Sequence, residues 1–100
     1  MKLETLFLQD GSKAFAFYCP GCGFFHHVRV DKGPAYDGGP IWAWNEDADK
    51  PTFSPSLGVN MGTDQQCHLF VRDGKIIYLE DSKHSLRGQT VEMENPDDWR

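Results

Sequence analysis

The sequence lacks long apolar segments, an excess of basic residues and an even set of cysteines. No apolar run approaches the roughly 18 residues of a membrane-spanning helix, and the N-terminus has no signal-peptide core. Ten Lys and Arg stand against 15 Asp and Glu, and the resulting net charge of −5 argues against general nucleic-acid binding. Three cysteines fit a metal site better than paired disulfides. We therefore expect a cytoplasmic protein without a membrane or nucleic-acid partner.

Helix signals are also missing from the sequence. No segment combines a capping residue with helical apolar periodicity, whereas short apolar runs separated by turn residues recur along the chain. Asp73-Gly74 lies between two such runs and predicts a two-residue hairpin turn that pairs Arg72 with Lys75. We expect a small all-β fold of antiparallel hairpins, with strands over residues 3–8, 14–18, 24–30, 42–44, 57–61, 67–72, 75–80 and 89–93.

Three segments are expected to lie outside these strands. Residues 51–56 read PTFSPS, and because proline cannot donate a ladder hydrogen bond we predict neither a central strand nor a helix there. Residues 31–41 are rich in glycine and proline and predict a loop, and a polar tail is expected from about residue 95. No linker or repeat interrupts the chain, so residues 1–100 are expected to form a single zinc-binding β domain.

The segment Cys19-Pro-Gly-Cys22-Gly23 is the most informative one in the chain. Two thiols at this spacing can bind one metal ion, and the glycines permit the backbone to curl around it. Apolar runs lead into and out of the segment, which places it at the tip of a hairpin. This combination is typical of a zinc-ribbon knuckle, and a structural zinc ion would help a small chain to fold.

The second half of the chain offers the remaining metal ligands. The hairpin register places Cys67 opposite Glu80, and His84 follows in the turn at the same end. Cys67 and His84 can therefore complete a tetrahedral Cys₃His site with Cys19 and Cys22.

Two other histidines are alternatives to His84 as the fourth ligand. His26 follows Cys22 at a separation that suits one ion, whereas His68 adjoins Cys67 and points to the opposite face of the strand unless a bulge intervenes. We rank His84 first, His26 second and His68 third. The competing interpretation of Cys67 is a small buried apolar side chain, since free cysteines are often buried.

Several short motifs follow one another along the chain. They are Cys19-Pro-Gly-Cys22-Gly23-x-x-His26, Trp42-x-Trp44-Asn45, Pro51-Thr52-Phe53-Ser54-Pro55-Ser56, Cys67-His68 and Asp81-x-x-His84-x-Leu86-x-Gly88-Gln89-Thr90-Val91. Together they resemble a family of small proteins of unknown function found in tailed phages, prophages and bacteria. The resemblance implies no particular activity. Relatives often have a cysteine where Ser82 stands, so the four-thiolate site of those relatives is not available here.

Aromatic and hydroxyl side chains form a second candidate site. A ligand- or peptide-binding surface could be built from Trp42, Trp44, Thr52, Phe53 and Ser54. The competing and preferred interpretation is that the large rings fill the core of a small β domain. No nucleophile-elbow context surrounds Ser54 or Ser56, so no catalytic residue is predicted there.

These observations favour a non-enzymatic function. We predict an accessory module that is stabilised by a structural zinc ion and binds a protein partner. If it is phage-encoded, it would act in the host cytoplasm. One alternative is a zinc-dependent hydrolase in which Glu80 or Asp81 serves as the base. The other is a nucleic-acid-binding zinc ribbon, which the acidic composition disfavours.

Overall fold

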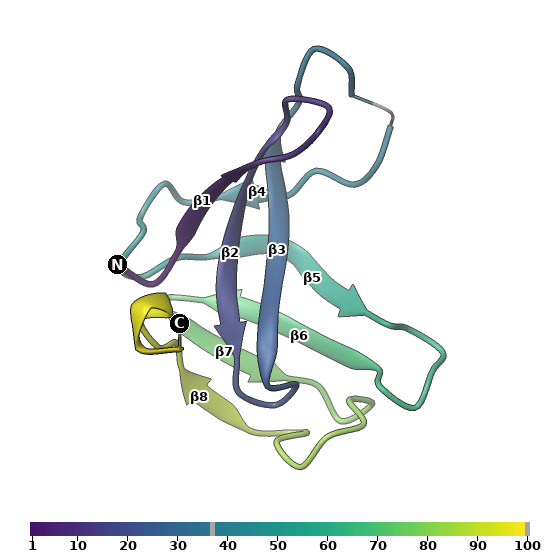
Figure 1. Ribbon diagram of the computed structural model, residues 1–100. Helices are drawn as coiled ribbons and strands as arrows, with labels where there is room; N and C mark the ends of the chain where they lie inside the picture. The colour runs from purple at the N-terminus through teal and green to yellow at the C-terminus, as the bar shows by residue number, and fades with distance from the viewer. Residues whose placement is uncertain (37, 100) are drawn as a thin grey trace.

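The computed structural model describes residues 1–36 and 38–99, and it contains two antiparallel β-sheets (Figure 1). The first sheet has the order β1-β2-β3, formed by β1 (Glu4–Phe7), β2 (Lys13–Cys19) and β3 (Phe24–Asp31). The second has the order β4-β5-β6-β7-β8, formed by β4 (Ala43–Trp44), β5 (Phe53–Val59), β6 (Cys67–Arg72), β7 (Lys75–Tyr78) and β8 (Thr90–Glu92). The prediction of an all-β fold built from antiparallel hairpins is confirmed.

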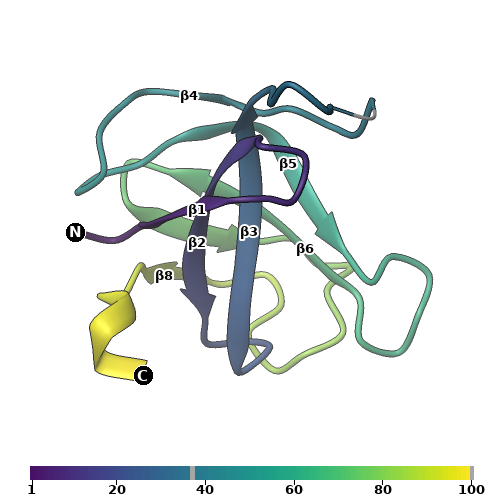
Figure 2. The ribbon, with the colours of Figure 1, turned by 45° about the horizontal axis from the view of Figure 1, so that its top comes forward.

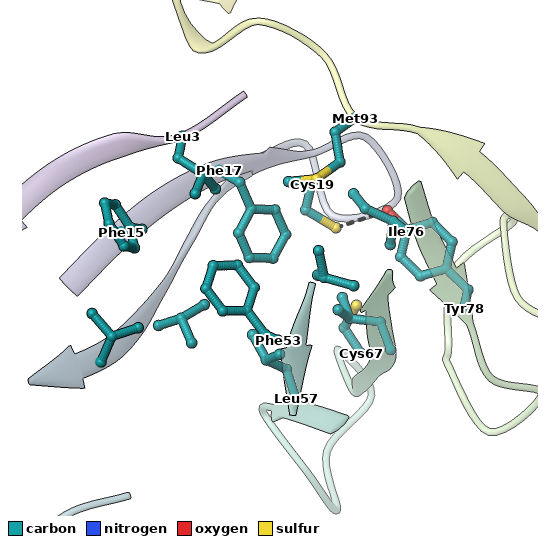
Figure 3. Packing of buried hydrophobic residues seen from close by; sticks show 14 residues of the cluster. Leu3, Phe15, Phe17, Cys19, Phe53, Leu57, Cys67, Ile76, Tyr78 and Met93 are labelled. Atoms are coloured by element: carbon teal, nitrogen blue, oxygen red, sulfur yellow. Dashed lines mark hydrogen bonds between the residues drawn. The ribbon is translucent and has the colours of Figure 1, made fainter. Parts of the chain in front are cut away.

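The core lies between the two sheets and follows from the alternation of side chains along each strand. In β6, Cys67, Leu69 and Val71 are fully buried, whereas the intervening residues reach the surface. The rings of Phe17 and Phe53 point toward each other across the two sheets (Figure 3). One continuous apolar cluster thus holds the first sheet against the second.

The β6–β7 hairpin has the predicted turn and register. Arg72 pairs with Lys75 and Val71 with Ile76. Asp73 has a φ of 48° and Gly74 a φ of 75°, so both turn residues adopt the left-handed conformation that a type I′ turn requires. This register is the one that the sequence predicts.

The prediction for residues 51–56 is wrong, because β5 runs through Pro55 and lies between β4 and β6. Phe53 pairs with Val71 and Leu57 with Leu69, and the register shifts between these two pairs. The residues between them form an irregular stretch in which Pro55 has no ladder hydrogen bond to donate.

The end of the chain is more regular than a frayed tail. A 3₁₀ helix, η1, spans Pro96–Trp99, and the Asn95 side chain accepts a hydrogen bond from the Asp97 amide at 3.0 Å. Figure 2 shows η1 beside the lower part of the first sheet. Within the described residues, no helix has the length and apolar character needed to span a bilayer.

Candidate active site and metal site

Two clusters of chemically active side chains meet at the first two residues of β6. Cys67 is fully buried and points into the space between the sheets, whereas His68 is 25% exposed and points to the outer face. Adjacent residues of a strand face opposite sides of the sheet, so this separation follows directly from the strand geometry. We describe the inner cluster first and the outer cluster second.

The inner cluster consists of Cys19, Cys22, His26 and Cys67, whose ligand atoms all lie within 4.8 Å of one another. Cys19 ends β2, Cys22 lies in the turn, and His26 lies on β3, so the knuckle supplies three of the four. Cys67 approaches from the second sheet, and Figure 3 shows its sulfur in the same region of the core as that of Cys19. The four side chains lie close enough to hold one metal ion.

A cation would resolve an unfavourable feature of His26. Its Nε2 atom is buried and has no hydrogen-bond partner in the part of the chain that the structure describes. A buried polar atom without a partner costs free energy, and most such atoms in proteins are satisfied. An imidazole nitrogen among three thiols is also a donor set that metal ions such as zinc bind well.

The pKa values of the three thiols also favour a bound cation. A hydrogen bond from the Cys67 thiol lowers the pKa of Cys19 to about 3. Burial, followed by the nearby Cys19 charge, raises the pKa of Cys22 to about 11. The hydrogen bond donated to Cys19 also raises the pKa of the Cys67 thiol. One thiolate therefore suppresses ionisation of the other two, and a bound cation is what would allow all three to be charged.

Two further side chains contact the sulfurs of this cluster. The Tyr78 hydroxyl lies 3.0 Å from Cys19 Sγ, and His84 Nε2 lies 3.3 Å from Cys67 Sγ. The His84 ring also packs against the knuckle, because a Cβ added at Gly21 would meet the ring at 2.4 Å. The sequence ranks His84 above His26 as the fourth ligand, whereas the group of four within 4.8 Å contains His26.

The outer cluster consists of Ser56, His68 and Asp81. Ser56 Oγ lies 3.1 Å from His68 Nε2, and His68 Nδ1 lies 3.1 and 3.2 Å from the two carboxylate oxygens of Asp81. Ser56 is half-buried, and the Asp81 side chain is 50% exposed. A hydroxyl, an imidazole and a carboxylate in this connected order have the arrangement of a Ser-His-Asp triad.

The hydrogen-bond roles in this chain of contacts can be assigned. An ionised carboxylate only accepts hydrogen bonds, so His68 Nδ1 carries the proton that it donates to Asp81. In the neutral imidazole, Nε2 then has a free lone pair and accepts the proton of the Ser56 hydroxyl. His68 is thereby held in the tautomer that a general base for Ser56 requires.

Backbone contacts fix the position of each member of the triad. The Ser82 hydroxyl donates to the His68 carbonyl at 2.9 Å and accepts from the His68 amide at 3.1 Å. Ser82 follows Asp81 directly, so the same two hydrogen bonds join the carboxylate-bearing loop to the histidine. On the other side, the Trp42 indole donates to the Ser56 carbonyl at 3.3 Å.

The aromatic residues predicted as a binding surface lie in different environments. Phe53 is 1% exposed and belongs to the core, and Trp42 and Trp44 are half-buried and packed against it. Thr52 accepts a hydrogen bond from the Asp73 amide, and Ser54 is exposed on β5.

The sequence does not indicate Ser56 as a functional residue. His68 is predicted from it only as a metal ligand, and Asp81 only as a base at a metal. The chain order Ser-His-Asp matches none of the three orders known for the α/β-hydrolase, chymotrypsin and subtilisin triads. No nucleophile elbow surrounds Ser56, so no local signal was available. The pairing of β5 with β6 is what brings the residues together.

Comparison with known proteins gives one match. A family model described as "Bacterial ubiquitination-like system serine protease (BubE)" matches residues 1–79, which include Ser56 and His68. No curated protein and no solved structure matches the chain. This match makes the prediction of a non-enzymatic protein-binding module wrong, because the family is described as a protease.

Proposed function

The chain belongs to the family of bacterial ubiquitination-like system serine proteases (BubE), and we propose that it is a serine protease in which Ser56 is the nucleophile. The observation that carries this proposal is the pair of contacts that His68 makes, with Ser56 through Nε2 and with Asp81 through Nδ1. A serine hydroxyl is a weak nucleophile unless an adjacent base removes its proton. The family description and the geometry of the outer cluster independently support the same chemistry.

The reaction proceeds in two steps. Ser56 Oγ attacks the carbonyl carbon of the scissile bond while His68 Nε2 takes the hydroxyl proton, and His68 then gives that proton to the leaving amine as the C–N bond breaks. Water attacks the resulting ester, His68 takes a proton from the water, and the proton returns to Ser56 as the acid product leaves. Asp81 orients the imidazole and stabilises its charged form in both steps.

The proposed substrate is a protein. The family description places the protease in a ubiquitination-like system. We take such a system to contain a ubiquitin-like protein with an extended C-terminal tail. We infer that the enzyme cuts an amide bond next to the C terminus of that ubiquitin-like protein. The protein partner that the sequence predicts would then be the substrate.

The metal site is proposed to hold zinc, with Cys19, Cys22, Cys67 and His26 as ligands. Four protein ligands close the tetrahedral coordination of zinc and leave no position for substrate, which is the pattern of a structural site. When bound, the ion would supply a cross-link between the knuckle and β6. The zinc-ribbon type of the knuckle, the phage origin and the cytoplasmic location stay predictions.

A fluorophosphonate probe tests the proposed nucleophile, because it reacts covalently with activated serines. We expect the wild-type protein to be labelled at Ser56, which peptide mass spectrometry would identify, and Ser56→Ala to be unlabelled. Ser54→Ala is the matched control, since Ser54 lies on the same strand and has no such histidine contact among the described hydrogen bonds. Wild-type protein that stays unlabelled, or labelling that survives Ser56→Ala, would refute the proposal.

A further inference from the structure

The strand that carries the nucleophile is covered on one side for only part of its length. β4 consists of Ala43 and Trp44, which pair with Ser54 and Phe53 at the beginning of β5. The later half of β5 has β6 on one side, and Figures 1 and 2 both show no strand of the described residues along its other side. The β5 edge therefore becomes free close to Ser56.

The peptide groups of Gly58 point toward this free edge. Gly58 pairs with His68, and the His68 backbone is engaged on its other side, where its carbonyl accepts from the Leu79 amide at 2.9 Å. In an antiparallel ladder such a pair shares no hydrogen bonds, and both residues direct their N–H and C=O groups away from each other. The Gly58 N–H and C=O groups are thus directed away from β6, to the side that β4 does not reach.

Among residues 1–36 and 38–99, Gly58 has the first peptide groups beyond Ser56 that face this edge without a hydrogen-bond partner. The Ser56 carbonyl, which points to the same side, already accepts the Trp42 indole N–H. Gly58 is exposed and has no side chain, so another backbone can approach closely. Two residues of strand separate it from Ser56 by roughly 7 Å, which is within reach of one short extended segment.

We propose that the free edge of β5 binds the main chain of the substrate as an added strand, with the Gly58 N–H and C=O groups as its hydrogen-bond partners. The ligand is an extended protein tail, because only an extended backbone matches the spacing of an exposed strand edge. This inference rests on the proposed function, since the nucleophile on the same strand is what makes a substrate the occupant. The pairing sets the register of the tail and hence the bond that lies at Ser56.

Substitution of Gly58 by proline or by alanine separates this role from folding. Proline removes the N–H and places its ring on the free edge, where no ladder hydrogen bond is lost, whereas alanine keeps the N–H. A Cβ at Gly58 would meet the Met61 side chain at 2.8 Å, so both variants are made in a Met61→Ala background. Melting curves would show whether the fold of each variant is intact, and fluorophosphonate labelling of Ser56 would show whether the triad is intact.

The substrate probe is the ubiquitin-like protein of the same system, extended by a short C-terminal peptide. We expect Gly58→Pro to lower kcat/KM for its cleavage at least about tenfold relative to Gly58→Ala, with equal Ser56 labelling in both. Equal cleavage by the two variants would overturn the binding edge and leave the nucleophile untouched. Absence of labelling in the wild-type protein would instead refute the proposed function.

Discussion

The two faces of β6 carry sites that differ in almost every physical respect. On the inner face, Cys67 is completely buried and belongs to a group of four side chains, drawn from both sheets, that lie close enough to hold one metal ion. On the outer face, His68 and Asp81 are 25% and 50% exposed, and His68 contacts both Asp81 and Ser56. An ion-binding cluster that stabilises a fold benefits from burial, whereas a nucleophile must be reached by its substrate.

The two sites are nevertheless joined by the shortest possible covalent link, because Cys67 and His68 are neighbours. The loop after β7 repeats this relationship: Asp81 contacts the outer histidine, and His84, in the same loop, contacts Cys67. One of the two sites should therefore depend on the other, but not the reverse. We expect the triad to need the inner cluster, which would hold β6 and this loop in place, and we expect the inner cluster not to need the triad.

Metal removal should give the largest effect, because it breaks both sites. Cys67 is distant in sequence from the other three side chains, which belong to the knuckle. The free energy of metal binding would therefore be part of the free energy of folding, and its loss is expected to cost on the order of 5 kcal/mol or more. Stripping the ion with a chelator should lower the melting temperature strongly and abolish fluorophosphonate labelling of Ser56. Added zinc should restore both.

The converse experiment uses Ser56→Ala, which should bind the metal in the same stoichiometry as the wild-type protein and melt within a few degrees of it. Elemental analysis and thermal melts followed by circular dichroism measure these two quantities. A metal-free protein that keeps its full stability and its Ser56 labelling would show that the two sites are independent.

The inner site could be predicted in outline from the sequence because its signals are local. The Cys-x-x-Cys spacing with its glycines indicates a knuckle, and Asp73-Gly74 indicates the hairpin whose register brings Cys67 to the same end of the molecule. The choice between His26 and His84 was beyond the sequence, because it depends on how the two sheets pack.

The outer site could not be predicted because nothing in its spacing is characteristic. Ser56 reaches His68 through the pairing of β5 with β6, and proline at position 55 argued against a central strand there. Asp81 reaches the histidine through a loop whose path depends on hydrogen bonds made by Ser82. Each of these features is a tertiary one, which a single sequence without a known motif does not reveal.

Asp81→Asn should give the next largest effect and confine it to the outer face. The amide can donate to His68 Nδ1, which favours the wrong tautomer, and we expect kcat for substrate cleavage to fall about 100-fold or more. Metal content and melting temperature should not change, since the Asp81 side chain is half-exposed. Asp64→Asn, at an exposed position in the loop between β5 and β6, is the matched control. Equal kcat values for the two variants would remove Asp81 from the triad.

Ser82→Ala should give the smallest of these effects, and it tests the link between the loop and the histidine. Ser82 is 1% exposed, and its loss leaves the His68 amide and carbonyl without their hydroxyl partner, which costs about 1–3 kcal/mol of folding free energy. We also expect kcat to fall about tenfold with little change in KM, because Asp81 and His68 would no longer be held at a fixed distance. The proton resonance of His68 Nδ1–H should shift or broaden as that hydrogen bond loosens. Ser85→Ala, which removes an exposed hydroxyl from the same loop, should change none of these quantities. If Ser82→Ala lowered stability while kcat and the His68 resonance stayed at their wild-type values, the contacts of Ser82 would serve the fold alone, and the two faces of β6 would be less closely connected than the hydrogen bonds indicate.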